Sequence, residues 1–489
     1  MPDMRSRGAL AGLACAALAL GVAELVSVLT GPRTSPLVAV GGAVVDATPE
    51  PVKEFAIRTF GANDKNALLL GTGLLLAACA AVLGTLAVRR PLAGYAGLGL
   101  FGLLGAVAAL TRPGAGPAAA LPSLIGVVAA AGALRFTLRS DGPQWRVDRR
   151  GVLIAFGAAA LAGLAGFRLA RRDQPVLALP EPVSAGPAGT DMKLPELTSF
   201  VTPNDTFYRV DTALVIPRLD PGTYRLRITG MVGRPLTLTL DDLLARGLVE
   251  REITLTCVSN EVGGELAGNA RWLGVPLRGL LGEARPRAGA DQVVGRSADG
   301  WTAGTPLAAC LDGRDALLAV GMNGTQLPPE HGFPVRMIVP GLYGYVSATK
   351  WLTELELSTF AAFDPYWVRR GWAEQAPIKT FSRIDTPRPF ARPRAGLVTV
   401  AGVAWAQRRG ISRVQVRADG GAWQEASLGT VGSIDTWRQW AWRWEATPGR
   451  HTLEVRAADT AGEFQPGERR APFPDGATGW HAVVVMVSA

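Results

Sequence analysis

Five long apolar segments in the first 170 residues constrain the fold of this chain more than any other feature. They cover residues 9–30, 66–88, 92–110, 118–134 and 151–169. Each approaches the roughly 20 residues that an α-helix needs to cross the hydrocarbon core of a bilayer. The sequence therefore predicts a membrane domain over residues 1–172, with five transmembrane helices in contact with the lipid bilayer.

Basic residues flank these segments on alternate sides. Arg5 and Arg7 precede the first segment, Arg89 and Arg90 separate the second from the third, and five arginines lie in residues 135–150. Basic loops face the cytoplasm by the positive-inside rule, so everything after the fifth segment is expected outside it. The predicted protein is a multi-pass cell-membrane protein with extracytoplasmic domains.

Two charged features of the predicted membrane domain suggest possible functions. Arg149 and Arg150 stand directly before the fifth segment, as in a twin-arginine export signal, but an ordinary basic flank has the same pattern. Glu24 is an acid deep in a span, which suggests either a functional carboxylate or a hydrogen bond to a neighbouring helix. The three histidines lie outside the spans, which excludes haem b held there by two histidines.

The net charge of +9 raises the question of nucleic-acid binding. The arginines are scattered, and the chain shows no basic block and no RNA- or DNA-binding motif, so no nucleic-acid partner is expected. The four cysteines are far apart and suggest neither a disulfide framework nor a zinc cluster.

Cys257 is the centre of the soluble part. Residues 252–264 read EITLTCVSNEVGG, in which a strand-like run ends at the cysteine and a polar, glycine-rich loop follows. A single thiol held rigidly between strand and loop suits a soft metal ligand. The alternative is a buried cysteine that packs as a small hydrophobe.

Other loops offer groups for an anionic, ring-containing cofactor. Asn204 supplies hydrogen-bond donors, and Phe207 and Tyr208 supply flat surfaces. Three cationic groups suited to a phosphate come later in the chain: His331, Arg336 and Lys350.

In this order and spacing, these residues resemble the sulfite oxidase family of molybdenum enzymes over most of residues 195–489. The resemblance implies a molybdenum–molybdopterin cofactor with Cys257 as the protein's metal ligand, and makes Cys257 and Arg209 the catalytic candidates. It implies an α+β molybdopterin domain over residues 196–373, after a linker at 173–195. The implied cofactor contacts are Asn204, Phe207, Tyr208, Cys257, Ser297, Asp299, His331, Arg336, Ser347 and Lys350.

The chain departs from the sulfite oxidases proper at two positions. These enzymes carry an arginine five residues after the cysteine, where this chain has Val262, and a histidine where it has Asp211. Both departures put sulfite in doubt as the substrate. Arg369, Arg370 and Trp372 are candidates for an alternative anion pocket.

Residues 374–489 show short alternating runs at 397–403, 414–418, 437–446, 453–457 and 480–487. Such runs, bounded by turn residues, predict an antiparallel β-sandwich. The segment resembles the immunoglobulin-like domain of the same family, which is associated with dimerisation, so a homodimer is a further expectation. Trp440, Trp442 and Trp444 fall on one strand face and are expected to serve packing.

The expected function is two-electron oxygen-atom transfer on a small-molecule substrate outside the cytoplasm. Two directions stay open: reduction of an S-oxide or N-oxide, and oxidation of a sulfite-like anion. A third hypothesis is a non-catalytic, membrane-tethered binding protein on the same scaffold. The sequence does not name the electron donor or acceptor.

Overall fold

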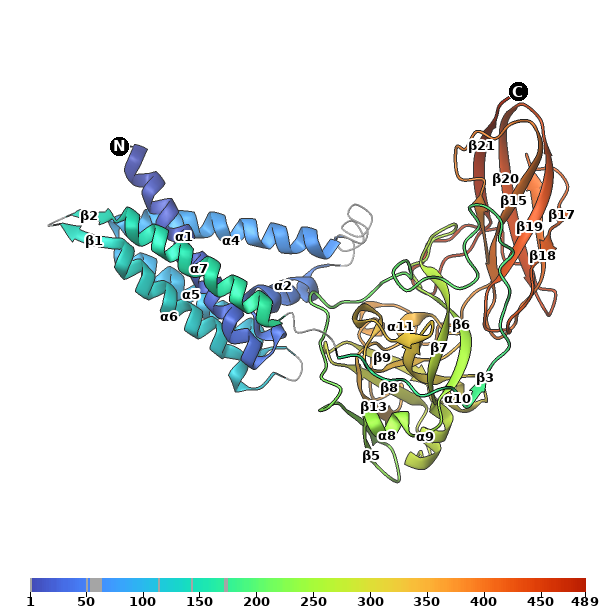
Figure 1. Cartoon of the computed structure of the whole chain (residues 1–489), viewed down its shortest axis with the longest axis horizontal. Coiled ribbons are helices and arrows are strands. Elements are labelled where there is room, and N and C mark those ends of the chain that lie inside the picture. The colour runs from blue at the N-terminus through green and yellow to red at the C-terminus, as the bar shows by residue number, and fades with distance from the viewer. Residues whose placement is uncertain (1, 50–51, 53–63, 113–114, 142–143, 171–174) are drawn as a thin grey trace. The chain divides into compact units, whose positions relative to one another are not determined.

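A computed structural model of the chain describes residues 2–49, 52, 64–112, 115–141, 144–170 and 175–489 (Figure 1). The chain forms two compact units. The first comprises Met1–Pro175 and Thr212–Pro217, and the second comprises Val176–Asp211 and Arg218–Ala489. The predicted domain boundary at residues 172–173 lies outside the described residues.

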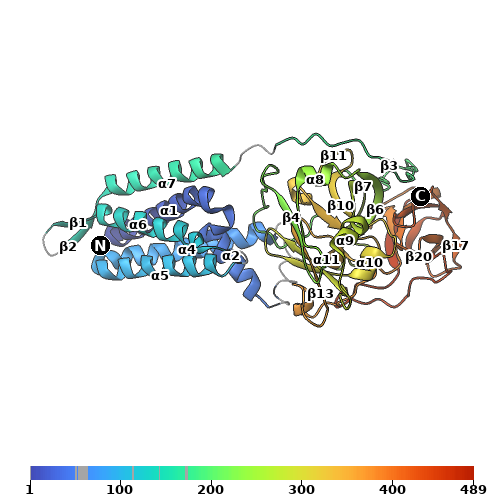
Figure 2. The ribbon, with the colours of Figure 1, turned by 90° about the horizontal axis from the view of Figure 1, so that it is seen from below.

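The first unit is helical, and its long helices run side by side in both views (Figures 1 and 2). Its helices are α1 (Pro2–Thr30), η1 (Pro32–Thr34), α2 (Pro36–Ala47), α4 (Asp64–Arg89), α5 (Pro91–Leu110), η3 (Pro117–Ala120), α6 (Leu121–Thr137) and α7 (Arg149–Ala170). Helix α1 packs against α4, α6 and α7. Gly8 and Gly84 allow the α1 and α4 backbones to meet, since a Cβ on Gly8 would lie 2.9 Å from the Thr85 Cα. This close approach is what small residues permit between apolar helices.

Four described helices are long and apolar enough to cross a membrane: Ser6–Thr30, Ala67–Arg89, Pro91–Leu110 and Pro117–Thr137. They coincide with the first four predicted segments. In the fifth, the described apolar stretch is the shorter helix Arg150–Gly166. Helix α2 was not predicted, and neither was the hairpin of β1 (Leu138–Asp141) and β2 (Gln144–Val147).

The first part of the second unit contains two mixed sheets. One has the order β11-β10-β7-β6-β3 with β12 beside β10, and the other has the order β5-β4-β13-β8-β9. The strands of the first sheet are β3 (Ser184–Ala185), β6 (Val249–Thr256), β7 (Ala267–Pro276), β10 (Leu317–Met322), β11 (Thr325–Gln326) and β12 (Arg336–Ile338). Those of the second are β4 (Arg225–Gly230), β5 (Leu236–Thr239), β8 (Gln292–Ser297), β9 (Thr302–Pro306) and β13 (Leu352–Ser358).

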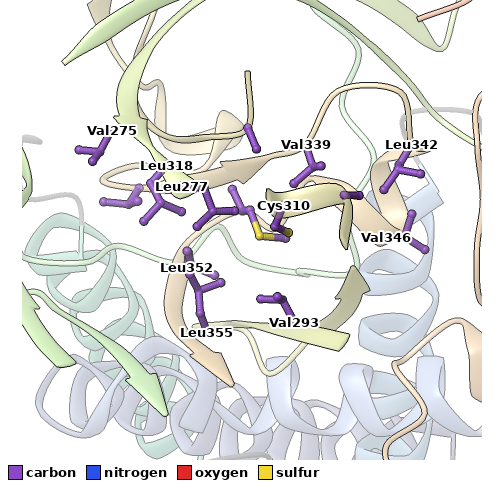
Figure 3. Packing of buried hydrophobic residues seen from close by; sticks show 14 of the residues in the cluster. Val275, Leu277, Val293, Cys310, Leu318, Val339, Leu342, Val346, Leu352 and Leu355 are labelled. Carbon is purple, nitrogen blue, oxygen red and sulfur yellow. The ribbon is translucent and has the colours of Figure 1, made fainter. Parts of the chain in front are cut away.

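Short helices cover this part, and a large apolar core lies between its elements. The helices are α8 (Leu240–Leu244), α9 (Leu277–Ala284), α10 (Leu307–Leu311), η4 (Pro329–His331), α11 (Gly344–Ser347) and η5 (Val368–Arg370). Cys310 packs in the core among Leu277, Val339 and other aliphatic side chains (Figure 3). Burial raises the pKa of the Cys310 thiol to about 12, so this cysteine is a small, unreactive hydrophobe.

Residues 381–487 form two four-stranded antiparallel sheets, β14-β15-β19-β18 and β17-β16-β20-β21. Their strands are β14 (Phe381–Thr386), β15 (Gly396–Trp405), β16 (Ile411–Ala418), β17 (Gln424–Glu425), β18 (Ser427–Leu428), β19 (Arg438–Ala446), β20 (Gly449–Asp459) and β21 (His481–Val487). Apolar side chains from both sheets share one core. The five predicted strand runs are confirmed. Trp440, Trp442 and Trp444 are buried in this core, as expected for packing residues.

The C-terminal sheets contact the strand that leads to Cys257. Strand β3 pairs with β6 only at Val249 and Glu250. Further along β6, the Thr254 N–H donates to the Asp435 carbonyl at 2.9 Å, and the Gln407 Nε2 donates to the Thr254 carbonyl at 3.0 Å. After the strand, the Arg383 Nη1 donates to the Gly264 carbonyl at 2.9 Å. Loops of the C-terminal part therefore satisfy the backbone of Thr254 on the open edge of β6, and Arg383 binds the loop that follows the strand.

Candidate active site

Cys257 lies at the end of β6, where the strand gives way to a closed loop. Its side chain is buried, its N–H donates to the Leu266 carbonyl at 2.9 Å, and its carbonyl accepts from the Asn260 N–H at 3.1 Å. Burial raises the pKa of the Cys257 thiol, while hydrogen bonds from Ser259 and the charge of Lys350 act in the opposite direction. A cation and hydrogen-bond donors beside the sulfur are the surroundings that favour a thiolate once a metal binds it.

Asp211 joins two cations at this site. Its Oδ2 accepts from the Arg209 Nε at 2.8 Å and from the Lys350 Nζ at 2.9 Å. Lys350 also donates to the Glu330 carbonyl at 2.9 Å. Burial lowers the pKa of Lys350 to about 8, although the Asp211 carboxylate opposes this shift. Asp211 is therefore a structural residue that holds Arg209 and Lys350 in place. The sequence pattern showed only that Asp211 replaces a histidine of the sulfite oxidases proper, and it did not indicate this role.

His331 and Arg336 form a second pair of basic side chains at the site. The Arg336 Nη1 donates to the His331 carbonyl at 3.0 Å, and its guanidinium carbon lies 4.9 Å from the Trp272 ring centroid. The His331 Nε2 lies 2.8 Å from the Asn204 carbonyl oxygen. Burial lowers the pKa of His331 to about 4 and that of Arg336 to about 10. At neutral pH the imidazole is therefore neutral, and the guanidinium carries the charge.

The early motif lies against this pair. The Phe207 ring stacks on Tyr208 at 5.2 Å and meets the His331 ring edge-on at 5.5 Å. The Asn204 Oδ1 accepts from the Asn323 Nδ2 at 2.8 Å, which orients the Asn204 amide. The pKa of Tyr208 is raised by burial and by the nearby Cys257 sulfur. The fold thus brings together residues that are more than a hundred positions apart in the sequence.

Ser297, Asp299 and Ser347 take part mainly in local turns. The Ser297 Oγ accepts from the Asp299 N–H at 3.4 Å, in a turn whose Ala298 N–H donates to the Trp351 carbonyl at 2.9 Å. The Ser347 hydroxyl donates to the Leu342 and Tyr343 carbonyls. All three lie in segments close to Lys350, and their predicted cofactor contacts stay predictions.

The predicted alternative anion pocket is partly engaged in other contacts. The Arg370 guanidinium lies 3.6 Å from the Tyr366 ring centroid and donates to the Tyr366 carbonyl at 2.8 Å. Trp372 is buried, and its ring lies 6.0 Å from that of Tyr345. Val262 is also buried in the apolar core.

Several buried polar atoms around Cys257 and Lys350 have no hydrogen-bond partner among the described residues. They are the His331 Nδ1, Arg336 Nε, Thr256 Oγ1, Asn260 Nδ2 and Thr349 Oγ1. Buried polar atoms without a partner are costly, and two of these, the His331 Nδ1 and the Arg336 Nε, belong to predicted cofactor contacts, where a ligand can supply the missing hydrogen bonds. The residues fit a polar, anionic cofactor held beside a thiol.

The described residues contain no group of three or more histidine, cysteine or acidic side chains placed to hold a metal ion. Molybdopterin supplies metal ligands through its dithiolene, and the single thiol of Cys257 fits the role of the protein's ligand beside it.

Comparisons with known proteins agree with this chemistry. The family model for the oxidoreductase molybdopterin binding domain matches residues 213–367. The chain is 33% identical over 296 residues to mitochondrial sulfite oxidase of Mus musculus, covering 51% of this chain and 53% of that protein. It is 32% identical over 319 residues to sulfite oxidase of Gallus gallus, covering 55% of this chain and 68% of that protein. It thus spans about half the length of the mouse protein.

A solved structure shares the fold. The sulfane dehydrogenase SoxCD from Paracoccus pantotrophus superposes with a TM-score of 0.52 at 24% identity, covering 59% of this chain and 84% of that chain. The site and the sequence relatives together show that this chain belongs to the sulfite oxidase family of molybdopterin-dependent oxidoreductases, with molybdenum–molybdopterin as its cofactor.

Proposed function

We propose that the chain is a membrane-anchored enzyme that reduces a neutral S-oxide or N-oxide by removing its oxygen atom. The main observation in favour of reduction is Val262, a buried apolar residue at the position where the sulfite oxidases proper have an arginine. Asp211 supports it, because its negative charge lies against Arg209 and Lys350. Less positive potential then remains to attract a substrate dianion.

Individual residues take the following proposed roles. Cys257 holds the metal as a thiolate, and His331, Arg336 and Lys350 bind the phosphate and the polar edge of the cofactor. Phe207 and Tyr208 flank its ring, Asn204 bonds to it, and Ser297, Asp299 and Ser347 line the pocket. Arg209, held in place by Asp211, faces the substrate. The bound cofactor supplies the two-electron oxygen-atom transfer, and the protein binds and orients the substrate.

Oxidation of a sulfite-like anion is the second candidate. Arg209 favours it, because its side chain is 36% exposed and a guanidinium binds oxyanions well. Arg370, whose guanidinium lies over the Tyr366 ring in the following segment, adds a second positive charge to this candidate. The similarity to proteins named sulfite oxidase points in the same direction.

We also propose a cellular location for the enzyme. Five transmembrane helices, made of the four candidate spans and α7, would anchor residues 1–172 in the cell membrane. The basic flanks would place the molybdopterin domain (196–373) and the C-terminal domain (374–489) on the extracytoplasmic side. The two C-terminal sheets would form an immunoglobulin-like sandwich that supports a homodimer. A separate electron donor or acceptor completes the reaction.

The purified full chain should be assayed in both directions. Reduced dye with methionine sulfoxide, dimethyl sulfoxide or trimethylamine N-oxide tests reduction, and sulfite with an artificial acceptor tests oxidation. We expect turnover in the first assay and none above the Cys257→Ser control in the second. Sulfite turnover with no oxide reduction would overturn the proposed direction.

A variant at Asp211 tests the electrostatic reasoning. Asp211→Asn removes the negative charge beside Arg209 while keeping the side-chain shape, so sulfate should inhibit oxide reduction more strongly in this variant. Asp312→Asn is the matched control, because Asp312 pairs with Arg314 on an exposed loop. Equal sulfate inhibition in parent and Asp211→Asn would contradict the assigned role of Asp211.

A further inference from the structure

The helical unit contains an apolar cavity of about 200 Å³, open on one side, between α1, α2, α4, α5 and α6. Aliphatic side chains such as Leu20, Leu37, Leu76 and Leu98 line it, and Phe101 contributes an aromatic ring. A buried apolar cavity of roughly 150 Å³ is known to take up benzene, so this cavity has room for a six-membered ring.

One residue breaks the apolar character of the lining. Ser123 on α6 is the single hydroxyl-bearing residue among the described residues that line the cavity. Its side chain is only 4% exposed, and its Oγ has no hydrogen-bond partner among the described residues. A Ser hydroxyl in a helix usually bonds back to its own backbone. A hydroxyl without a hydrogen-bond partner in an apolar cavity therefore indicates a ligand that contains an oxygen atom.

The polar end of the cavity can be located from its neighbours. A Cβ added to Gly105 would lie 2.7 Å from the Ser123 Oγ and 3.5 Å from the Pro36 Cβ, so Ser123 and Pro36 lie at the same end. Pro36 directly follows Ser35, whose hydroxyl donates to the Glu24 carboxylate. Glu24 is the one acidic residue in the four described candidate spans. Ser123 therefore supplies the polar end of the lining, and the Ser35–Glu24 pair lies directly behind Pro36, outside the lining itself.

We propose that this cavity binds the ring of a membrane-soluble quinone or quinol, with the Ser123 Oγ hydrogen-bonded to a ring oxygen. An acyl chain would fill the same volume but would leave the hydroxyl unmet. The choice of a redox-active ring rests on the oxidoreductase family of the chain, which requires an electron partner, and not on the proposed substrate. The described helices between residues 6 and 137 contain no histidine to hold haem in that role.

The test measures binding of a radiolabelled decyl-benzoquinone to the full chain in phospholipid nanodiscs, after subtraction of its uptake by empty nanodiscs. Ser123→Ala should weaken saturable binding about five-fold, which corresponds to the roughly 1 kcal/mol of one hydrogen bond. Its melting temperature without quinone should stay equal or rise, because the change removes an unmet buried hydroxyl. The matched control is Thr85→Val, in a candidate span but outside the cavity lining, whose hydroxyl donates to the Val82 carbonyl.

A second variant tests the location without relying on the hydrogen bond. Leu98→Trp puts a larger side chain into the cavity and should abolish saturable binding. Unchanged binding in both Ser123→Ala and Leu98→Trp would overturn the proposal. So would decylbenzene displacing the quinone as well as unlabelled quinone does, because that result identifies an acyl-chain cavity.

The binding measurement is independent of turnover. Cys257→Ser should bind the quinone normally while losing oxygen-atom transfer. Failure of the quinone proposal and failure of the proposed reaction therefore give different results.

Discussion

Thr254, three residues before Cys257, carries a buried hydrogen-bond chain that links β6 to the C-terminal sheets. Its side chain is fully buried. Its Oγ1 accepts from the Trp437 N–H at 2.7 Å and donates to the Asn269 Oδ1 at 3.0 Å. Thr254→Val keeps the shape of the side chain and removes both bonds. One N–H and one carbonyl oxygen are then left buried without these partners.

Each such group costs about 1–3 kcal/mol, so we expect β6 to lose about 3 kcal/mol of local stability. A loss of this size makes the local opening of β6 roughly 100-fold more frequent. Hydrogen exchange followed by mass spectrometry, on peptides covering residues 249–266 of the cofactor-free chain, measures this directly. Peptides from α9 serve as an internal reference.

Thr256→Val is the matched control, because Thr256 lies two residues further along the same strand. It is also fully buried, but its Oγ1 has no partner among the described residues. We expect unchanged exchange in the cofactor-free chain, because Thr256→Val removes no hydrogen bond to the described residues. Equal exchange in Thr254→Val and the parent would refute the reasoning, and so would equal increases in the two variants.

Four further outcomes are expected. Cys257→Ser should abolish turnover and remove molybdenum from the purified protein, because a hydroxyl is a poor ligand for this metal, while circular dichroism stays unchanged. Arg336→Ala should lower molybdopterin content measured by pterin fluorescence, whereas full occupancy would show that another residue binds the phosphate. Because the folded-state pKa of His331 is about 4, below the ordinary 6.5, the unfolded chain binds more protons between these values. The cofactor-free chain should therefore lose stability as pH falls from 6.5 to 4, and His331→Gln should reduce the slope in thermal melts. Replacement of Arg149 and Arg150 by lysine keeps the charge but should leave the C-terminal domains protected from protease in spheroplasts, and equal digestion of variant and parent would support an ordinary basic flank.

The features that could be predicted from the sequence are those that depend on neighbouring residues. The four long apolar segments, the alternating C-terminal runs and the strand that ends at Cys257 each follow from local periodicity. The family could be recognised because the order and spacing of these residues are characteristic. The apolar run of α2 was also visible, with a proline at its first position, but at 12 residues it is too short for a span.

Long-range pairings could not be predicted in this way. Asp211 and Lys350 are 139 residues apart, and neither position shows a local pattern that would pair them. The same is true of Thr254 and Trp437, which are 183 residues apart. Such contacts arise from the packing of strands that lie next to one another only in the folded chain, so the position of a charge along the sequence does not reveal its partner.

The contact between His481 and the loop after Cys257 has a consequence for the timing of assembly. Gly263 has a φ of +82°, and a Cβ at this position would clash with the His481 ring, so the loop closes directly against the start of β21. The ribosome makes His481 long after it has made Cys257. We therefore expect molybdopterin insertion to follow the synthesis and folding of β21. A chain truncated before β21 should lack the contact that closes the loop after Cys257 and should contain no cofactor.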